Sequence, residues 1–185
     1  MPRLFIAVDI PESIRRKIAW LEMPAASAAR VTPPDDLHIT LHFIGEVSDS
    51  LSDVLQTQLR SVTASTFAVE LSGVGFFANR GGPEILWAGI VLSAELLSLQ
   101  AAVGEVLKSL EIKLDDREFN PHMTVARLKR RSPVTAAEFA ERNSSFHAGF
   151  TATSFSLYCV APHGQEPHYR VVEEYALQKP QCQQS

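Results

Sequence analysis

The chain has 185 residues, an apolar fraction of 45% and a formal net charge of −4 at pH 7. These values predict one compact domain, or two small lobes that share a core, of the ordinary globular class. The negative net charge argues against a protein that coats long nucleic acids, but it permits a site that binds a single phosphate.

The N-terminal apolar run covers only residues 4–8, which is too short for the apolar region of a signal peptide. No later run reaches the roughly 18 apolar residues of a membrane helix. Without an export signal, Cys159 and Cys182 are interpreted as reduced thiols. The chain is therefore expected to be a cytoplasmic protein that has no membrane partner.

Hydrophobic periodicity and turn residues predict the same order of elements in both halves of the chain. The first half gives a strand over 4–10, a helix over 11–23, a strand over 37–44, a helix over 48–62 and a strand over 67–77 with a bend at Gly73 and Gly75. The second half gives a strand over 85–92, a helix over 93–110, a strand over 122–128, a helix over 133–142 and strands over 151–160 and 169–177.

This doubling predicts an α+β fold, a duplicated bilobal domain in which helices cover mainly antiparallel sheets. The domain is expected to span 1–178, with pseudo-repeats at about 1–77 and 84–178. Residues 179–185 are expected to form a disordered tail.

Matching strands of the two halves carry the same polar pattern. Residues 37–43 read L-H-I-T-L-H-F, and residues 121–127 read P-H-M-T-V-A-R. Because side chains alternate between the faces of a strand, His38 and Thr40 share one face and Phe43 lies on the other.

The second motif gives the same arrangement, with His122 and Thr124 on one face. If a pseudo-twofold axis relates the halves, two imidazole–hydroxyl pairs face each other across a central cleft. One histidine can then act as acid and the other as base, while the hydroxyls hold an anion. A purely structural histidine is the alternative, and it is the favoured interpretation for His42.

His38 and His42 also have the spacing of zinc ligands on a helix. On a strand, however, residues four apart lie roughly 13 Å from each other. No cysteine or acidic residue lies at a matching spacing from these histidines to complete a metal site, so no metal is expected.

The paired H-I-T-L and H-M-T-V motifs, the opening R-L-F-I-A-V-D-I-P and the G-V-G-F-F followed by L-W-A-G-I resemble the two-histidine (2H) phosphoesterase superfamily. The most similar branch is the RNA 2′,3′-cyclic phosphodiesterases, also called 2′-5′ RNA ligases. The resemblance implies metal-independent hydrolysis of a 2′,3′-cyclic phosphate to a 2′-phosphate, with no cofactor. It also implies a bilobal fold whose two histidine strands line a central cleft.

The resemblance also implies roles for individual residues. His38 is the proton donor to the leaving 3′ oxygen, His122 accepts a proton from the attacking water, and Thr40 and Thr124 hold the phosphate. The histidines exchange roles in the reverse reaction, which joins a cyclic end to a 5′-hydroxyl through a 2′-5′ bond.

The cation that contacts the phosphate is less closely defined. Arg127 matches the family pattern, although strict strand alternation places it on the face opposite to His122. Arg80 and the run 129–131 are further candidates. Four aromatic residues can stack on a base or pack in the core: Phe76, Phe77, Phe119 and Tyr169.

The expected partners are RNA ends that bear a 2′,3′-cyclic phosphate, or cyclic nucleotides, bound by a monomer. Two alternatives stay open: a phosphodiesterase for another small cyclic phosphate, and a non-catalytic module that binds an RNA end or a nucleotide. The segment 162–168 departs from the family pattern, so the selectivity for RNA ends can differ there.

Overall fold

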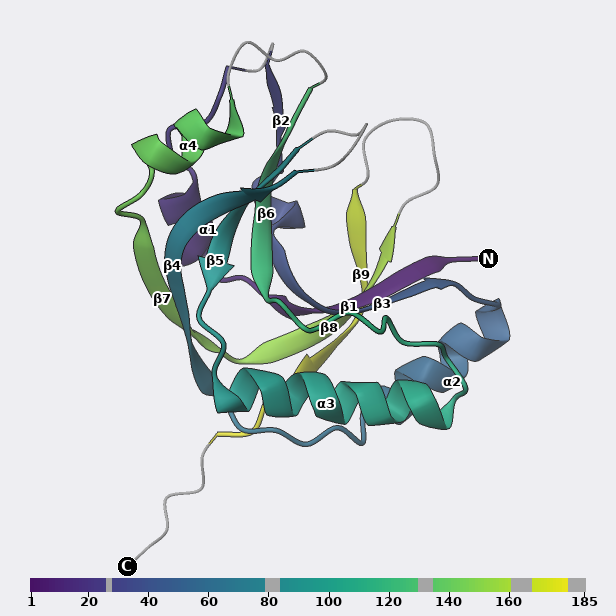
Figure 1. Cartoon of the computed structure of the whole chain (residues 1–185). Coiled ribbons are helices and arrows are strands. Elements are labelled where there is room, and N and C mark those ends of the chain that lie inside the picture. Colours follow the sequence, from purple (N-terminus) through teal and green to yellow (C-terminus); the bar gives the residue numbers. More distant parts are fainter. Residues whose placement is uncertain (26–27, 79–83, 130–134, 161–167, 180–185) are drawn as a thin grey trace, which may run out of the picture.

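The computed structural model describes residues 1–25, 28–78, 84–129, 135–160 and 168–179 (Figure 1). Its helices are α1 (Glu12–Ile18), α2 (Asp49–Leu59), α3 (Ala94–Ser109) and α4 (Ala136–Arg142), and a 3₁₀ turn covers Pro34–Asp36. Its strands are β1 (Arg3–Asp9), β2 (Ala29–Val31), β3 (His38–Glu46), β4 (Phe67–Phe77), β5 (Ile85–Ile90), β6 (His122–Leu128), β7 (His147–Ala152), β8 (Ser154–Val160) and β9 (Tyr169–Ala176).

The strands form two antiparallel sheets, which confirms the predicted α+β class. The four-stranded sheet has the order β3-β1-β8-β9, and the five-stranded sheet has the order β2-β6-β5-β4-β7. Each sheet contains strands from both halves of the chain: β8 lies beside β1, and β4 lies beside β5 (Figure 1). The partial orders β3-β1-β8 and β6-β5-β4 match each other under a pseudo-twofold relation. The pseudo-repeats over 1–77 and 84–178 stay a prediction.

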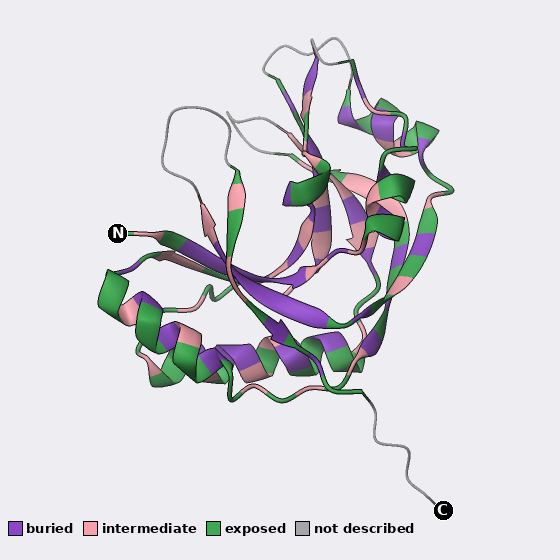
Figure 2. Cartoon of the chain, turned by 180° about the vertical axis from the view of Figure 1, so that it is seen from behind, coloured by how far each residue is buried: buried purple, intermediate pink, exposed green. Residues whose placement is uncertain are grey.

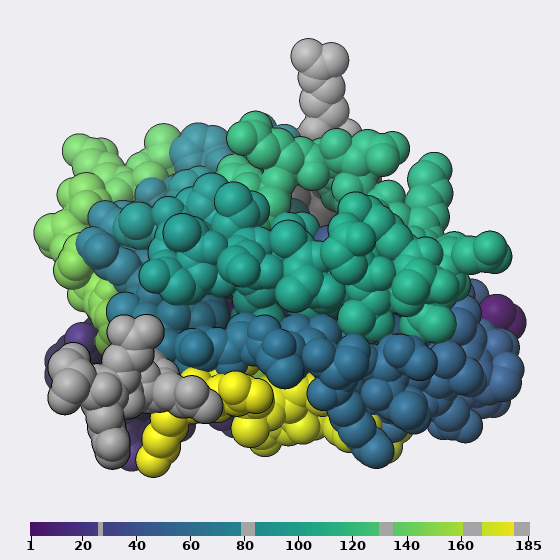
Figure 3. Space-filling model, turned by 90° about the horizontal axis from the view of Figure 1, so that it is seen from below, coloured from purple at the N-terminus to yellow at the C-terminus, as the bar shows by residue number. Residues whose placement is uncertain are grey.

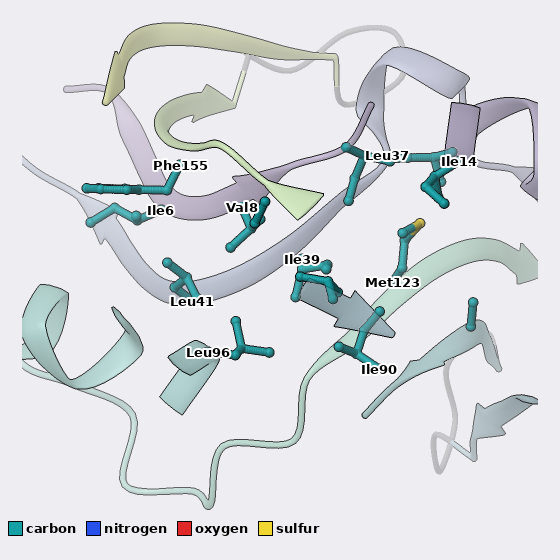
Figure 4. Close-up of a cluster of buried hydrophobic side chains, with 14 of the residues drawn as sticks. Ile6, Val8, Ile14, Leu37, Ile39, Leu41, Ile90, Leu96, Met123 and Phe155 are labelled. Carbon is teal, nitrogen blue, oxygen red and sulfur yellow. The ribbon is translucent and has the colours of Figure 1, made fainter. Parts of the chain in front are cut away.

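The core lies where the two sheets and α3 meet. β1 is buried from Leu4 to Val8, so both of its faces are covered (Figure 2). One continuous apolar cluster unites Ile39 of β3 with Leu96 of α3 and Met123 of β6 (Figure 4). Since β3 and β6 bury their odd-numbered motif residues in this core, their His-x-Thr faces are directed away from it.

The helices pack on the outside of this core. α2 and α3 lie side by side across one face of the molecule (Figure 3), where α3 also contacts β3 and β4. Both begin at serine caps: Ser48 Oγ accepts the N–H of Leu51 at 3.2 Å, and Ser93 Oγ accepts the N–H of Leu96 at 3.1 Å. Within the described residues, no helix is long and apolar enough to cross a membrane.

The predicted strand over 151–160 is wrong, because the chain changes sheets at Thr153. Residues up to Ala152 belong to β7 and pair with β4, whereas residues from Ser154 belong to β8 and pair with β1 and β9. No glycine or proline marks the crossing, so the alternating pattern continues through it.

Some element ends also differ from the prediction. The first helix stops at Ile18 rather than at Met23, because its last residues form tighter turns in which the Leu21 N–H bonds to the Ile18 carbonyl. The three-residue strand β2 was not predicted, since it is too short to show periodicity. Of the predicted tail, 180–185 lies outside the described residues.

Candidate active site

Each motif strand contains a β-bulge directly after its His-x-Thr sequence. In β3 the extra residue is Leu41, and in β6 it is Val125, as the register shifts against β1 and β5 show. An extra residue reverses the alternation of the side chains that follow it. Phe43 and Arg127, each two places past the extra residue, are therefore turned to the same side as the motifs.

These bulges change two predicted positions. Phe43 was expected on the face opposite to His38, but it lines the same cavity and is 61% exposed. Arg127, which strict alternation places away from His122, also lines that cavity. Strict alternation was thus the wrong assumption for both residues.

A cleft of about 820 Å³ lies between the two sheets. Its lining includes His38 and Thr40 from β3, and His122, Thr124 and Arg127 from β6. The structure therefore brings all five predicted site residues into one cavity. The predicted central cleft, lined by both sheets, is confirmed.

The two histidines are held in the same way. His38 Nδ1 lies 2.7 Å from the carbonyl oxygen of Asp36, and His122 Nδ1 lies 2.9 Å from that of Asn120. A carbonyl oxygen can only accept, so Nδ1 carries the hydrogen in both rings. This leaves Nε2 of each histidine as the nitrogen that can exchange a proton with a ligand.

Burial lowers the pKa of His38 below its ordinary value of 6.5. The backbone hydrogen bond and the negative charge of Asp36 partly oppose this effect, whereas the positive charges of His122 and Arg127 lower the pKa further. His38 is therefore mainly neutral at pH 7 in the free protein. An anion bound beside it would favour its protonated form.

Aromatic rings enclose His38. The Phe5 ring lies 4.7 Å from the imidazole, and the Tyr169 ring meets it edge-on at 5.1 Å. The buried carboxylate of Asp36 accepts the backbone N–H of Tyr169 at 3.1 Å. Asp36 thus joins the start of β9 to the turn that holds His38. The sequence shows it only as one of two adjacent acids in a loop.

Positive charge gathers on the cleft wall although the whole chain is acidic. Among the described residues, the cleft lining contains four arginines, Arg3, Arg30, Arg117 and Arg127, and three acids, Asp36, Asp115 and Glu118. Arg30 lies directly opposite Arg127 in the pairing of β2 with β6, whereas Arg117 is bonded to Asp115. Arg3 and Arg30 were missed as site residues because neither belongs to a His-x-Thr motif and β2 was not predicted.

The other predicted candidates divide into two groups. Of the four aromatic residues, Phe77, Phe119 and Tyr169 line the cleft, whereas Phe76 does not. Among the other cations, Lys129 is not part of the cleft lining, and Arg80, Arg130 and Arg131 lie outside the described residues.

His42, which is predicted to be structural, also lines the cleft but has different contacts from His38. The bulge turns it towards α3, where its Nε2 lies 2.8 Å from the carbonyl oxygen of Gln100. His38 and His42 therefore do not converge on one point as metal ligands would. In the described part of the chain, no group of three or more His, Cys, Asp or Glu side chains could hold a metal ion.

A family model described as the 2′-5′ RNA ligase superfamily matches residues 10–161. The chain belongs to this superfamily. A protein from Archaeoglobus fulgidus named RNA 2′,3′-cyclic phosphodiesterase is 39% identical over 136 residues, which are 72% of this chain and 77% of that protein. One of the same name from Methanocaldococcus jannaschii is 30% identical and covers 94% of this chain and 99% of its own length. The crystal structure of Escherichia coli LigT complexed with phosphate has a TM-score of 0.75 and 25% identity, covering 96% of this chain and 99% of that one.

Proposed function

We propose that this protein hydrolyses 2′,3′-cyclic phosphates at RNA ends or on nucleotides to 2′-phosphates. The observation that carries the proposal is the pair of matched histidines, His38 and His122, in one cleft. Each has its Nδ1 fixed by a backbone carbonyl and its Nε2 available to a ligand. The names of the relatives support the same substrate class.

The reaction needs one proton supplied and one removed on opposite sides of the phosphorus atom. His38, as imidazolium, donates its Nε2 proton to O3′ while the P–O3′ bond breaks. Neutral His122 accepts a proton at Nε2 from the water whose oxygen bonds to phosphorus. Two histidines suit these roles at neutral pH, because an imidazole changes its charge near pH 6.5. The phosphate remains on O2′.

Thr40, Thr124 and Arg127 hold the phosphate in this mechanism. A cyclic diester carries a single negative charge, so two hydroxyl donors and one guanidinium suit it. The aromatic walls of the cleft, including Phe43 and Tyr169, offer surfaces for the ribose and base. A 5′-hydroxyl in place of water would form a 2′-5′ bond in the same site. Because O3′ still leaves, each histidine would keep its role in this step, and the exchange of roles expected from the sequence does not apply to it.

The enzyme is also proposed to act as a monomer in the cytoplasm, as a single bilobal domain over 1–178. The doubled order of elements in the sequence supports the single bilobal domain. RNA ends that bear cyclic phosphates are its proposed partners.

The test compares three substrates: a 2′,3′-cyclic mononucleotide, an RNA oligonucleotide with a 2′,3′-cyclic end, and the same oligonucleotide with a 3′-phosphate. The wild type is expected to turn over the first two and to leave the third unchanged, and His38→Ala and His122→Ala should reduce both activities by about 10²–10⁴-fold. Tight binding of the cyclic-ended RNA without turnover would instead support a non-catalytic binding module.

A further inference from the structure

A second, smaller cavity of about 220 Å³ opens beside His122. We call it the Trp87 hollow; its principal lining residues are Ser72, Phe77, Trp87, Gly89, Asn120 and His122. Three of these, Phe77, Asn120 and His122, also line the main cleft. A molecule in the hollow would therefore adjoin the same imidazole that faces the phosphate site.

Glycines make room for the hollow. Gly75 is paired with Trp87, and a Cβ at Gly75 would lie 2.5 Å from the indole ring. Gly89, opposite His122 in the sheet, would bring a Cβ to 2.6 Å from the Ser72 carbonyl oxygen. Distances below 3 Å are not tolerated, so neither position can carry a side chain in this arrangement. The indole thus lies close against the strands.

The corresponding surface beside His38 is filled. Asp9 is opposite His38 in the sheet, as Gly89 is opposite His122. The Asp9 carboxylate accepts hydrogen bonds from Ser156 Oγ at 2.9 Å and from the Tyr158 hydroxyl at 2.6 Å. Only the His122 side of the described site therefore offers an open aromatic hollow.

The hollow has the chemistry of a nucleobase site. The Phe77 ring lies 5.4 Å from the Trp87 ring and meets the His122 ring edge-on at 4.8 Å. Such rings bind bases by stacking. The indole Nε1 is buried and has no hydrogen-bond partner among the described residues. Because Nε1 is shielded from solvent, the indole ring rather than this N–H is the surface that the hollow offers to a base.

We propose that the Trp87 hollow binds the nucleoside whose 5′-hydroxyl can replace water as the nucleophile. The inference rests on the proposed function, in which His122 serves the incoming oxygen and His38 serves the departing O3′. The nucleoside that approaches from the His122 side then meets the hollow. The O5′–P bond forms and the P–O3′ bond breaks, His122 Nε2 takes the O5′ proton, and His38 gives its proton to O3′. The product is a 2′-5′ diester.

The test measures how one cyclic nucleotide divides between two nucleophiles. The protein is incubated with 2′,3′-cyclic CMP and adenosine, and the ratio of 2′-5′ dinucleotide to 2′-CMP is determined by chromatography. Both products form in the same tube, so a general loss of activity does not change the ratio. Ser72→Tyr, which places a ring over the hollow from an exposed position of β4, should lower the ratio about tenfold, the effect of one lost stacking contact.

Ala68→Tyr is the matched control. Ala68 is exposed on the same face of β4 but does not line the hollow, so this variant should keep the wild-type ratio. An unchanged ratio in Ser72→Tyr would overturn the proposal. A raised KM for the cyclic nucleotide alone would also overturn it, because the hollow would then hold the base of the substrate. If the wild type gives 2′-CMP but no dinucleotide, the hollow is not an acceptor site and the proposed function stands; no 2′-CMP at all would remove the proposed function.

A binding measurement supplies a readout without chemistry. The chain has two tryptophans, and Trp20 is 87% exposed, so Trp20→Phe leaves Trp87 as the only indole at little structural cost. Adenosine should change the Trp87 emission saturably in this background. The change should be lost when Ser72→Tyr is added. A linear, non-saturating response in both proteins would contradict binding at the hollow.

Discussion

The ring of Tyr169 meets the imidazole of His38 edge-on, with the ring centroids 5.1 Å apart. The contact joins residues 131 positions apart in the chain, and Asp36 maintains it. The side-chain carboxylate of Asp36 accepts the backbone N–H of Tyr169. The backbone carbonyl oxygen of Asp36 lies 2.7 Å from His38 Nδ1. Asp36 is therefore a positioning residue for the predicted acid.

Asp36→Ala should loosen Tyr169 and lower kcat/KM about tenfold. The loss of a buried hydrogen bond to a charged group should also lower the free energy of unfolding by about 1.5–3 kcal/mol. Steady-state kinetics and urea unfolding measure the two effects. Asp36→Asn is the matched control, because its amide oxygen can still accept the N–H. Since the charge of Asp36 raises the pKa of His38, the Asn variant should shift the limb of the kcat/KM profile that His38 sets to lower pH. An unshifted limb would show that Asp36 acts on the fold alone.

His38→Ala and His122→Ala should each reduce hydrolysis by about 10²–10⁴-fold, the range of general acid–base catalysis. Circular dichroism should show an intact fold in both variants. A substrate with sulfur in place of O3′ separates the two roles, because a thiolate leaves without being protonated. His38→Ala should recover much of its activity on this substrate, and His122→Ala should not. The opposite pattern would exchange the assignment of donor and acceptor.

The pH profile of kcat/KM should be bell-shaped, because one imidazole must be protonated and the other neutral. This parameter reports the free protein, in which burial lowers the pKa of His38. The limb of the profile that His38 sets should therefore have its midpoint below the ordinary histidine pKa of 6.5. A profile that stays flat from about pH 5 to 9, across the titration range of histidine, would contradict a two-histidine mechanism.

Arg127→Ala should lower kcat/KM about 10–100-fold, since it removes a charge-assisted hydrogen bond of about 1.5–3 kcal/mol to the phosphate. Arg127→Lys should restore part of the loss, because it keeps the charge without the guanidinium fork. Arg16→Ala is the control for net charge, as Arg16 is exposed on α1 and does not line the cleft. Equal losses in Arg16→Ala and Arg127→Ala would mean that only long-range attraction is involved.

His42 should matter for stability rather than for catalysis. His42→Phe keeps a ring of similar shape but removes the hydrogen bond to the Gln100 carbonyl, which should cost about 0.5–1.5 kcal/mol in the free energy of unfolding. Burial lowers the pKa of His42, so folding favours its neutral form. Its contribution is present above pH 6.5, the ordinary histidine value, and is lost as the pH falls through the lowered folded pKa.

Thermal unfolding from pH 7.5 down to about pH 5, across the titration range of histidine, tests this assignment. The wild-type Tm should fall as the pH decreases, and the His42→Phe variant should show a shallower fall. Part of the fall should remain, because His38 has a lowered pKa of the same sign. Identical slopes in the two proteins would show that His42 does not contribute.

The sequence predicted the motif strands well because their signals are local. The alternation of His38 with Ile39 and of His122 with Met123 separates polar from apolar faces within a few residues. The strands over 67–77 and 122–128 agree with the structure residue for residue. The bend expected at Gly73 is confirmed by its positive φ of 68° and by the register shift beside it.

The rest depends on contacts between distant segments. The bulges at Leu41 and Val125 arise from pairing with β1 and β5, and neither residue is unusual in sequence. Without the bulges, Arg127 and Phe43 could not be assigned to the cleft. The change of sheet at Thr153 likewise depends on pairing with distant strands, β4 before it and β1 after it, and not on a turn residue. Asp36 can position Tyr169 only because the fold places the start of β9 beside it.

The central claim is most directly tested by phosphorus NMR of the purified protein incubated with a 2′,3′-cyclic nucleotide in excess EDTA. The account predicts that the cyclic phosphate signal is replaced by that of the 2′-phosphate alone. This result would establish O3′ as the leaving group and show that no chelatable metal is needed. Accumulation of the 3′-phosphate, or turnover only after a divalent metal is added back, would contradict the account.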